Sequence, residues 1–448
     1  MDTPIKDFID EYVGKKAVRM HMPGHKGVSN AIEACDITEI AGADVLYLGD
    51  GIIAKSQANA TQIFGTKKTV YSTEGSSLSI RAMVYMLCTY AKQKGKACKI
   101  LAGRNAHKVF STAVALCDVA VEWLYPTVSA GLNSCLITAK DVDEYLRKEV
   151  EKPIALYLTS PDYVGNILDI KSISKVCKKH DVLLVVDNAH GAYLKFLKDS
   201  IHPIDLGADM CCDSAHKTLS ALTGAGYLHI SATAPEFFAQ NVEHAMTLFA
   251  STSPSYLILN SLDSLNLYLA KDYKTALADV IEKIDVLKAE LKNVGYDVLL
   301  SEPLKVVIKT KSYGYLGVKI EKHLEENNVY CEFSDPDYLV LMVSEKTSDG
   351  DIERVKKALL SIKKGERIQE KFPPTTQPQA VVSIKDALFA LYEEIDVNSS
   401  EGRILALPTV ACPPAIPIVV GGERIDKACI ENFRYYGVKK VKVIKNTD

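Results

Sequence analysis

Short apolar runs alternate with amphipathic stretches along the N-terminal part of the chain. The runs are rich in aliphatic and β-branched residues, which predicts buried strands of a mostly parallel sheet. These predicted strands are 99–102, 119–125, 154–159, 182–186 and 208–212. Between them, apolar residues recur at helical spacing, which predicts helices at 78–91, 139–150 and 169–180. This strand–helix–strand order indicates a doubly wound α/β fold, whose functional residues gather at the carboxyl ends of the strands.

The pattern changes near Gly295, where a second type of unit begins. Strands are predicted at 304–309, 329–333 and 338–343, and helices at 314–325 and 351–363. We therefore expect a compact α+β unit after the α/β part, and then a Pro-rich linker. The expected domains are a 1–30 arm, a 31–265 large domain, a 266–370 small domain with its connecting helix, a 371–380 linker and a 381–448 C-terminal domain.

Composition is that of an ordinary globular enzyme. The 448 residues are 47% hydrophobic and 24% charged, and the net charge of −3 gives no reason to expect nucleic acid or a membrane surface as a partner. Eleven cysteines are scattered without CxxC spacing, which indicates free thiols in a reducing cytoplasm and no metal site. We find no signal peptide and no apolar run long enough to cross a membrane, so a cytoplasmic location is expected.

Two chemically suggestive residues follow neighbouring predicted strands. Asp187 comes after one apolar run, and the segment Ser214 to Lys217 comes after the next. A lysine whose pKa is lowered can form a Schiff base with pyridoxal phosphate (PLP), and His216 beside it can share proton traffic. A carboxylate can keep the cofactor's pyridine nitrogen protonated. A surface lysine and an ordinary strand-end carboxylate are the alternative, but their paired placement favours a cofactor site.

A cluster of small residues precedes the helix predicted at 78–91. Backbone N–H groups at a helix N-terminus attract anions, and the hydroxyls of Ser76 and Ser77 add donors suited to a phosphate. Serine is also a common N-cap, which is the alternative role for this pair. The hydroxyl of Ser214 is a further candidate phosphate donor.

The segments SAHKTLSALTGAGYLH and VVDNAHGAYL resemble the fold-type I PLP enzymes. They are most similar to the Orn/Lys/Arg decarboxylase family, which usually shows D-E-A-H-G and S-x-H-K, and the likeness extends to H-M-P-G-H-K-G at 21–27. The resemblance implies an α/β large domain with a mostly parallel sheet and helices on both faces, an α+β small domain and a C-terminal decarboxylase-type domain. It is to a short form of the family, without the N-terminal wing domain of longer relatives.

The resemblance also implies roles for individual residues. Lys217 would hold PLP, Asp187 would face the ring nitrogen, and His107 in R-N-A-H-K would stack on the ring. The turn that holds the phosphate in the family matches Gly75, Ser76 and Ser77. Further expected cofactor contacts are Ala189, Ser214 and His216, and the candidates to return a proton to the substrate are His190, His216 and Lys217.

The implied activity is decarboxylation of lysine, ornithine or arginine to an amine and CO₂, as in polyamine biosynthesis, in a homodimer or larger homo-oligomer with shared active sites. The distal positive charge of such a substrate needs an acidic partner. The candidates, which the sequence does not rank, are Asp44, Asp50, Glu74 and Glu423. A loop similar to the family's T-x-P-T-Y-x-G could place Thr159, Ser160 or Tyr163 in the site.

Four positions depart from the family pattern. Tyr47 stands where histidine is usual, Leu78 and Ala415 where glycine is usual, and Leu407 where an acidic residue is usual. These departures keep two alternatives open. The same scaffold could support an aminotransferase or a lyase that uses PLP, or a homologue that binds PLP with impaired catalysis.

Overall fold

The computed structural model describes residues 1–126, 131–408 and 414–446. Cys412 and Pro413, which precede the Pro414-Ala-Ile-Pro417 segment, lie outside this part of the chain. The fold divides into two compact units that interleave along the sequence. One unit comprises 1–98, 154–157 and 170–277, and the other comprises 99–153, 158–169 and 278–448.

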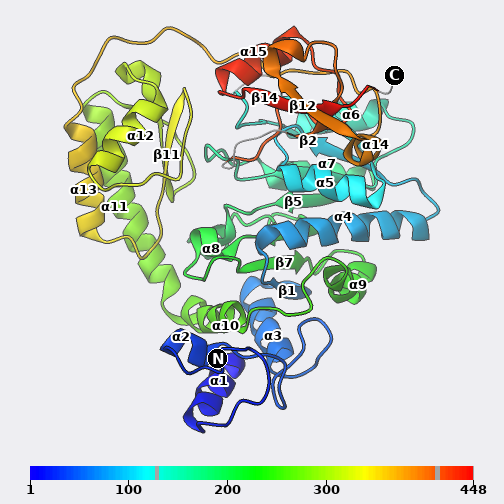
Figure 1. Cartoon of the computed structure of the whole chain (residues 1–448), viewed down its shortest axis with the longest axis vertical. Coiled ribbons are helices and arrows are strands. Elements are labelled where there is room, and N and C mark those ends of the chain that lie inside the picture. The colour runs from blue at the N-terminus through cyan, green and yellow to red at the C-terminus, as the bar shows by residue number, and fades with distance from the viewer. Residues whose placement is uncertain (127–130, 409–413, 447–448) are drawn as a thin grey trace. The chain divides into compact units, whose positions relative to one another are not determined.

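A seven-stranded sheet has the order β1–β7–β6–β5–β4–β2–β3 (Figure 1). Its strands are β1 (Lys68–Ser72), β2 (Lys99–Gly103), β3 (Ala120–Leu124), β4 (Ala155–Thr159), β5 (Leu183–Asp187), β6 (Met210–Asp213) and β7 (Gly226–Ile230). Strands β5 and β6 run parallel, as do β2 and β3, whereas β7 is antiparallel to both β6 and β1. The predicted α/β class is therefore confirmed, with a mixed sheet.

Helix α4 (Gly75–Gln93) packs on β6 and β7 in the first unit (Figure 1). Its buried face includes Leu78, Ala82, Met83 and Met86, the apolar spacing that predicted the helix. The remaining helices that lie wholly in this unit are α1 (Pro4–Gly14), α2 (Ala31–Cys35), α3 (Ile52–Phe64), α7 (Ile170–Lys179), η1 (Ala192–Phe196), α8 (Ala215–Thr218), α9 (Glu236–Thr247) and α10 (Tyr256–Lys271).

The second unit contains two smaller antiparallel sheets. One has the order β10–β11–β9–β8, with β8 (Asp297–Val298), β9 (Lys305–Lys309), β10 (Phe333–Ser334) and β11 (Tyr338–Met342). The strand predicted at 329–333 is thus mostly loop. Val329 bonds back to the end of the preceding helix, and Cys331 donates to the carboxylate of Glu321, which takes this segment away from the ladder.

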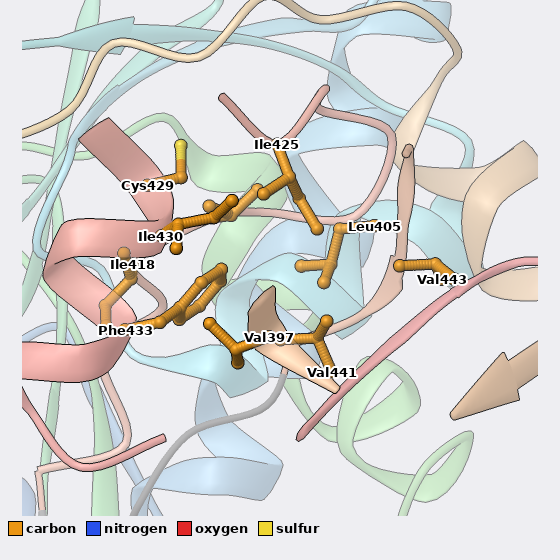
Figure 2. Close-up of a cluster of buried hydrophobic side chains, with 10 residues drawn as sticks. Val397, Leu405, Ile418, Ile425, Cys429, Ile430, Phe433, Val441 and Val443 are labelled. Carbon is orange, nitrogen blue, oxygen red and sulfur yellow. The ribbon is translucent and has the colours of Figure 1, made fainter. Parts of the chain in front are cut away.

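The other small sheet belongs to the C-terminal region and has the order β12–β14–β13, with β12 (Tyr392–Asp396), β13 (Leu405–Leu407) and β14 (Lys440–Ile444). Apolar residues from β13, β14 and α15 (Lys427–Tyr435) contribute to a buried cluster that includes Leu405, Phe433 and Val441 (Figure 2). The other helices of this unit are α5 (Lys108–Cys117), α6 (Ala139–Lys148), η2 (Thr310–Tyr313), α12 (Gly317–Glu326), α13 (Asp349–Leu360), α14 (Ile384–Phe389) and η3 (Val397–Ser399); α11 (Tyr273–Asn293) has residues in both units.

None of the helices in the described ranges has the length and apolar composition that a bilayer crossing requires.

Candidate functional site

The candidate site lies where β5 and β6 end side by side. Asp187 is the last residue of β5 and pairs in register with Cys212 of β6. Asp213 ends β6, and the short helix α8 that follows carries Lys217. Because the two strands are parallel neighbours, both segments leave the sheet at the same edge. The placement of Asp187 and Lys217 predicted from the sequence is thus reproduced at the level of the backbone.

Lys217 contacts a histidine from the turn after β5. Its Nζ lies 3.1 Å from Nε2 of His190, which is buried. The turn is closed by the N–H of Gly191, which donates to the carbonyl of Asn188. The amine of Lys217 therefore has a proton-accepting neighbour inside the site.

Asp187 is held by three donors, of which the sequence predicted none. The N–H of Ala189 donates to Oδ1 (3.2 Å), the thiol of Cys212 also donates to Oδ1 (3.7 Å), and the hydroxyl of Tyr157 donates to Oδ2 (3.3 Å). Burial raises the pKa of Asp187, and the positive charge of Lys217 opposes that rise. An N–H donor on a pyridine ring would relieve the cost of burying this carboxylate.

A group of donors for a phosphate gathers at the start of α4. The helix begins at Gly75, so Ser76 and Ser77 lie in its first turn and neither is the N-cap. Glu74 is the N-cap and makes no side-chain capping bond, so the first-turn N–H groups receive no acceptor from it. The hydroxyl of Ser214 donates to that of Ser76 across 3.0 Å.

The backbone around this helix start is closely packed. Gly75 has φ +64°, its N–H donates to the carbonyl of Gly224 (2.7 Å), and a Cβ added there would lie 3.4 Å from the ring of His216. The ring of His216 donates through Nδ1 to the carbonyl of Ala225 (2.9 Å), so this histidine fixes the turn before β7. A helix N-terminus, two hydroxyls, a lysine and a buried carboxylate match the functional groups of PLP, so these residues fit that cofactor.

His107 belongs to the second unit, where it is the N-cap of α5. Its Nδ1 accepts the N–H of Val109 at 3.2 Å, and its stacking role stays a prediction. The same unit contains the loop after β4. There Ser160 accepts the N–H of Leu168 (3.0 Å) and Tyr163 donates to Glu332 (2.5 Å).

The acidic candidates for the distal charge differ in their surroundings. Glu423 forms a buried ion pair with Arg104 (3.1 Å), and Asp44 accepts two N–H groups at the start of α3. Glu74 accepts the N–H of Ser251 (2.9 Å), and Asp50 is exposed. Asp44 and Glu423 are buried and bonded within the fold, whereas Glu74 is half-buried and Asp50 exposed, so the last two stay candidates.

The four residues that depart from the family pattern have defined surroundings in the structure. Tyr47 is buried and donates to the carbonyl of Tyr71 (2.7 Å), and Leu78 lies in the core. Leu407 ends β13 and is half-buried. Ala415 has φ +56°, a left-handed conformation that glycine adopts without strain. The glycine that is usual at this position thus has a backbone explanation.

A group of buried polar residues around Asp213 was not predicted from the sequence. Its carboxylate contacts His202, His229 and Asn188, none of which was assigned a role. The available signal was Asp213 itself, a charged residue that ends an apolar run just as Asp187 does.

Comparisons with known proteins agree with this geometry. A family model described as Orn/Lys/Arg decarboxylase, major domain, matches residues 3–296. An arginine decarboxylase of Bacillus subtilis is 28% identical over 480 residues, covering 100% of this chain and 94% of the relative.

Among solved structures, the lysine decarboxylase of Francisella novicida superposes with a TM-score of 0.82 at 18% identity, covering 99% of this chain and 81% of that one. A serine palmitoyltransferase from S. paucimobilis with bound PLP superposes with a TM-score of 0.52 at 13% identity, covering 69% and 75%.

Proposed function

Since this chain belongs to the Orn/Lys/Arg decarboxylase family, we propose that it decarboxylates a basic amino acid with the help of PLP. The observation that carries the proposal is the 3.1 Å contact between Nζ of Lys217 and Nε2 of His190. Lys217 follows β6, which lies beside β5, the strand that ends at the buried Asp187. Lysines in such sites attach covalently to the cofactor, and the neighbouring carboxylate holds the ring nitrogen.

When bound, PLP supplies a sink for the electron pair that is left when the bond from Cα to the carboxylate breaks. The residues around it bind and orient. Ser76, Ser77 and Ser214 would hold the phosphate, and Asp187 would accept the ring N–H. Tyr157 and Cys212 hold the carboxylate of Asp187 in position by donating hydrogen bonds to its two oxygens. Release of CO₂ then requires a substrate whose carboxylate stands perpendicular to the ring, which fixed contacts supply.

A proton must be returned to Cα after CO₂ leaves. His190 and Lys217 form a hydrogen-bonded pair, so a proton on either nitrogen can be replaced from the other. Nδ1 of His216 donates to the carbonyl of Ala225, whereas Nε2 of His190 lies beside the amine of Lys217. We therefore assign the proton return to the pair of Lys217 and His190.

The substrate would be arginine, lysine or ornithine. Two relatives that cover 97–100% of the chain are named arginine decarboxylases, which makes arginine the first substrate to assay. Glu74 and Asp50 are the proposed partners of its distal charge. The amine product of such a reaction is of the kind used in polyamine biosynthesis.

The N-terminal region supports a homodimer. The apolar side chains of Val18, Met20, Met22, Val28 and Leu48 are 68–90% exposed, and a second copy of the chain would cover such groups. We expect Met20→Asp to shift sedimentation from dimer to monomer. A reducing cytoplasm is the proposed location, since the ten cysteines of the described part are free thiols.

The deciding experiment records the absorbance of the protein with PLP and then CO₂ release from arginine, lysine and ornithine. A visible band that borohydride removes, absent in Lys217→Ala and kept in the control Lys198→Ala, with CO₂ from one substrate, is the expected result. No band in the unmodified protein would overturn the cofactor assignment. A band with amino-group transfer and no CO₂ would identify an aminotransferase, and a band with neither reaction would identify an impaired homologue.

A further inference from the structure

Four adjacent strands of the first unit are joined by a continuous series of buried polar side chains. Asn188 follows β5, Asp213 ends β6, His229 lies on β7 and Thr69 lies on β1. His202, from the segment before β6, completes the group. We call these five residues the Asp213 network, and each is at most 1% exposed.

Asp213 is the centre of this network. Its Oδ1 accepts from Nδ2 of Asn188 (2.7 Å), and its Oδ2 accepts from Nε2 of His202 (3.0 Å) and of His229 (3.1 Å). Three N–H donors therefore satisfy one buried carboxylate, which stabilises its ionised form. Neighbouring imidazoles lower the pKa of Asp213, in agreement with this arrangement.

At the outer ends of the network, each histidine has a second contact through Nδ1. Nδ1 of His229 lies 2.9 Å from the hydroxyl of Thr69, and Nδ1 of His202 accepts the N–H of Ile204 (3.4 Å). Since an ionised carboxylate only accepts hydrogen bonds, each Nε2 carries the hydrogen that it donates to Asp213.

We propose that Asp213 is a positioning residue that fixes the relative placement of Asp187 and Lys217. Asn188 is the residue after Asp187, and Asp213 begins the segment that leads through Ser214 to Lys217. The bond from Asn188 to Asp213 joins the two strand ends at the point where the site starts. A second bond, from the N–H of Asn188 to the carbonyl of Cys212 (3.0 Å), closes the same junction.

The cofactor is the natural probe of this placement, because its ring and phosphate would be held by groups on both strand ends; in this respect the inference rests on the proposed function. Asn188→Ala removes the side chain that joins the strand ends. Thr69→Val removes a buried hydrogen bond from the far end of the same network, at β1, with a side chain of equal size. The two variants therefore differ in where they break the network.

The experiment measures the dissociation constant of PLP for each apoprotein, the position of the visible band and the unfolding temperature. We expect both variants to unfold at similarly lowered temperatures. Asn188→Ala should weaken PLP binding about tenfold or more and move the band, whereas Thr69→Val stays within about twofold of the unmodified protein. Equal effects of the two variants on PLP would overturn the positioning role.

Asp213 itself is tested by a conservative and a drastic change. In Asp213→Asn, the amide oxygen can accept both histidines. If the Asn188 amide turns over, its Oδ1, a buried atom with no other partner in the described structure, can accept from the new NH₂. Asp213→Asn should therefore retain PLP affinity that Asp213→Ala loses. Loss in both variants would overturn a geometric role. Failure of the unmodified protein to bind PLP would instead refute the proposed function, and the inference with it.

Discussion

Nζ of Lys217 lies 3.1 Å from Nε2 of His190. His190 is held on the turn after β5 while Lys217 comes from the helix after β6, so the contact is made between neighbouring strand ends. The two nitrogens are within hydrogen-bonding distance, so a proton can pass from one to the other. Chemistry that needs an amine as nucleophile and a proton donor nearby is thus served by two residues whose positions are set by the sheet.

The first prediction concerns His190. His190→Gln keeps a polar side chain of similar size but removes the group that exchanges a proton with Lys217. We expect kcat for decarboxylation to fall roughly 10²-fold, the lower end of general acid–base effects. Steady-state CO₂ release measures it, and His180→Gln, at the end of α7, is the control. An unchanged kcat would assign the proton return to another residue.

Tyr157 gives the second prediction. Tyr157→Phe removes the hydroxyl that donates to Oδ2 of Asp187 (3.3 Å) and leaves the ring in the core. A hydrogen bond to an ionised group contributes about 1.5–3 kcal/mol, so we expect kcat/KM to fall by roughly 10-fold to 100-fold. Tyr145→Phe on α6 is a matched loss of a buried hydroxyl. If both variants behave alike, the contact to Asp187 has no catalytic consequence.

The third prediction separates fold from substrate binding at Glu423. Glu423→Gln leaves the guanidinium of Arg104 buried without its charged partner, which destabilises a protein by about 3–5 kcal/mol. Urea unfolding should show this loss, while the KM for the amino acid stays near that of the unmodified enzyme. A large rise in KM with unchanged stability would return Glu423 to the list of substrate contacts. The exposed ion pair between Lys385 and Asp118 (2.7 Å) offers a control, because Lys385→Gln should leave the unfolding free energy nearly unchanged.

The fourth prediction concerns pH and Asp335, which lies just before β11. Burial raises the pKa of Asp335 from 3.8 to about 6. Between those values the folded chain keeps a proton that the unfolded chain has released, so stability falls as pH rises through this window. Asp335 alone should account for about 2–3 kcal/mol of that fall.

Asp335→Asn removes this titration and keeps an acceptor for the N–H groups of Asp337 and Tyr338. Relative to the unmodified protein, the variant should therefore gain about 2–3 kcal/mol in unfolding free energy between about pH 4 and pH 7.5. Urea unfolding at both pH values measures it, with the exposed Asp279→Asn as control. A constant difference between variant and parent would show that Asp335 titrates normally.

Much of the fold could be predicted because local patterns carry it. The runs before Asp187 and Asp213 are apolar over their whole length, as strands covered on both faces must be, and they form β5 and β6. The apolar face of α4 could be predicted in the same way. The start of α4 could not, because Gly75 begins the helix with a left-handed φ, which the spacing of apolar residues does not indicate.

The partners within the site could not be predicted from the sequence. Tyr157 and Cys212 face Asp187 from two different strands, and nothing local marks either as a donor to that carboxylate. His202 and His229 likewise meet only because β7 returns antiparallel beside β6. Motifs show which residues carry chemistry, whereas the residues that orient them depend on strand order.

The interleaving of the two units has a consequence for synthesis on the ribosome. Strand β1 is made early, yet its ladder partner β7 is encoded far downstream, at Gly226–Ile230. The nascent chain must therefore carry β1 with an open edge through the translation of much of the second unit's α/β portion. During this interval a chaperone could bind the unpaired edge of β1, and slow translation after β7 would give β1 time to pair. Both effects would influence β1 more than a strand that pairs with its neighbour in sequence.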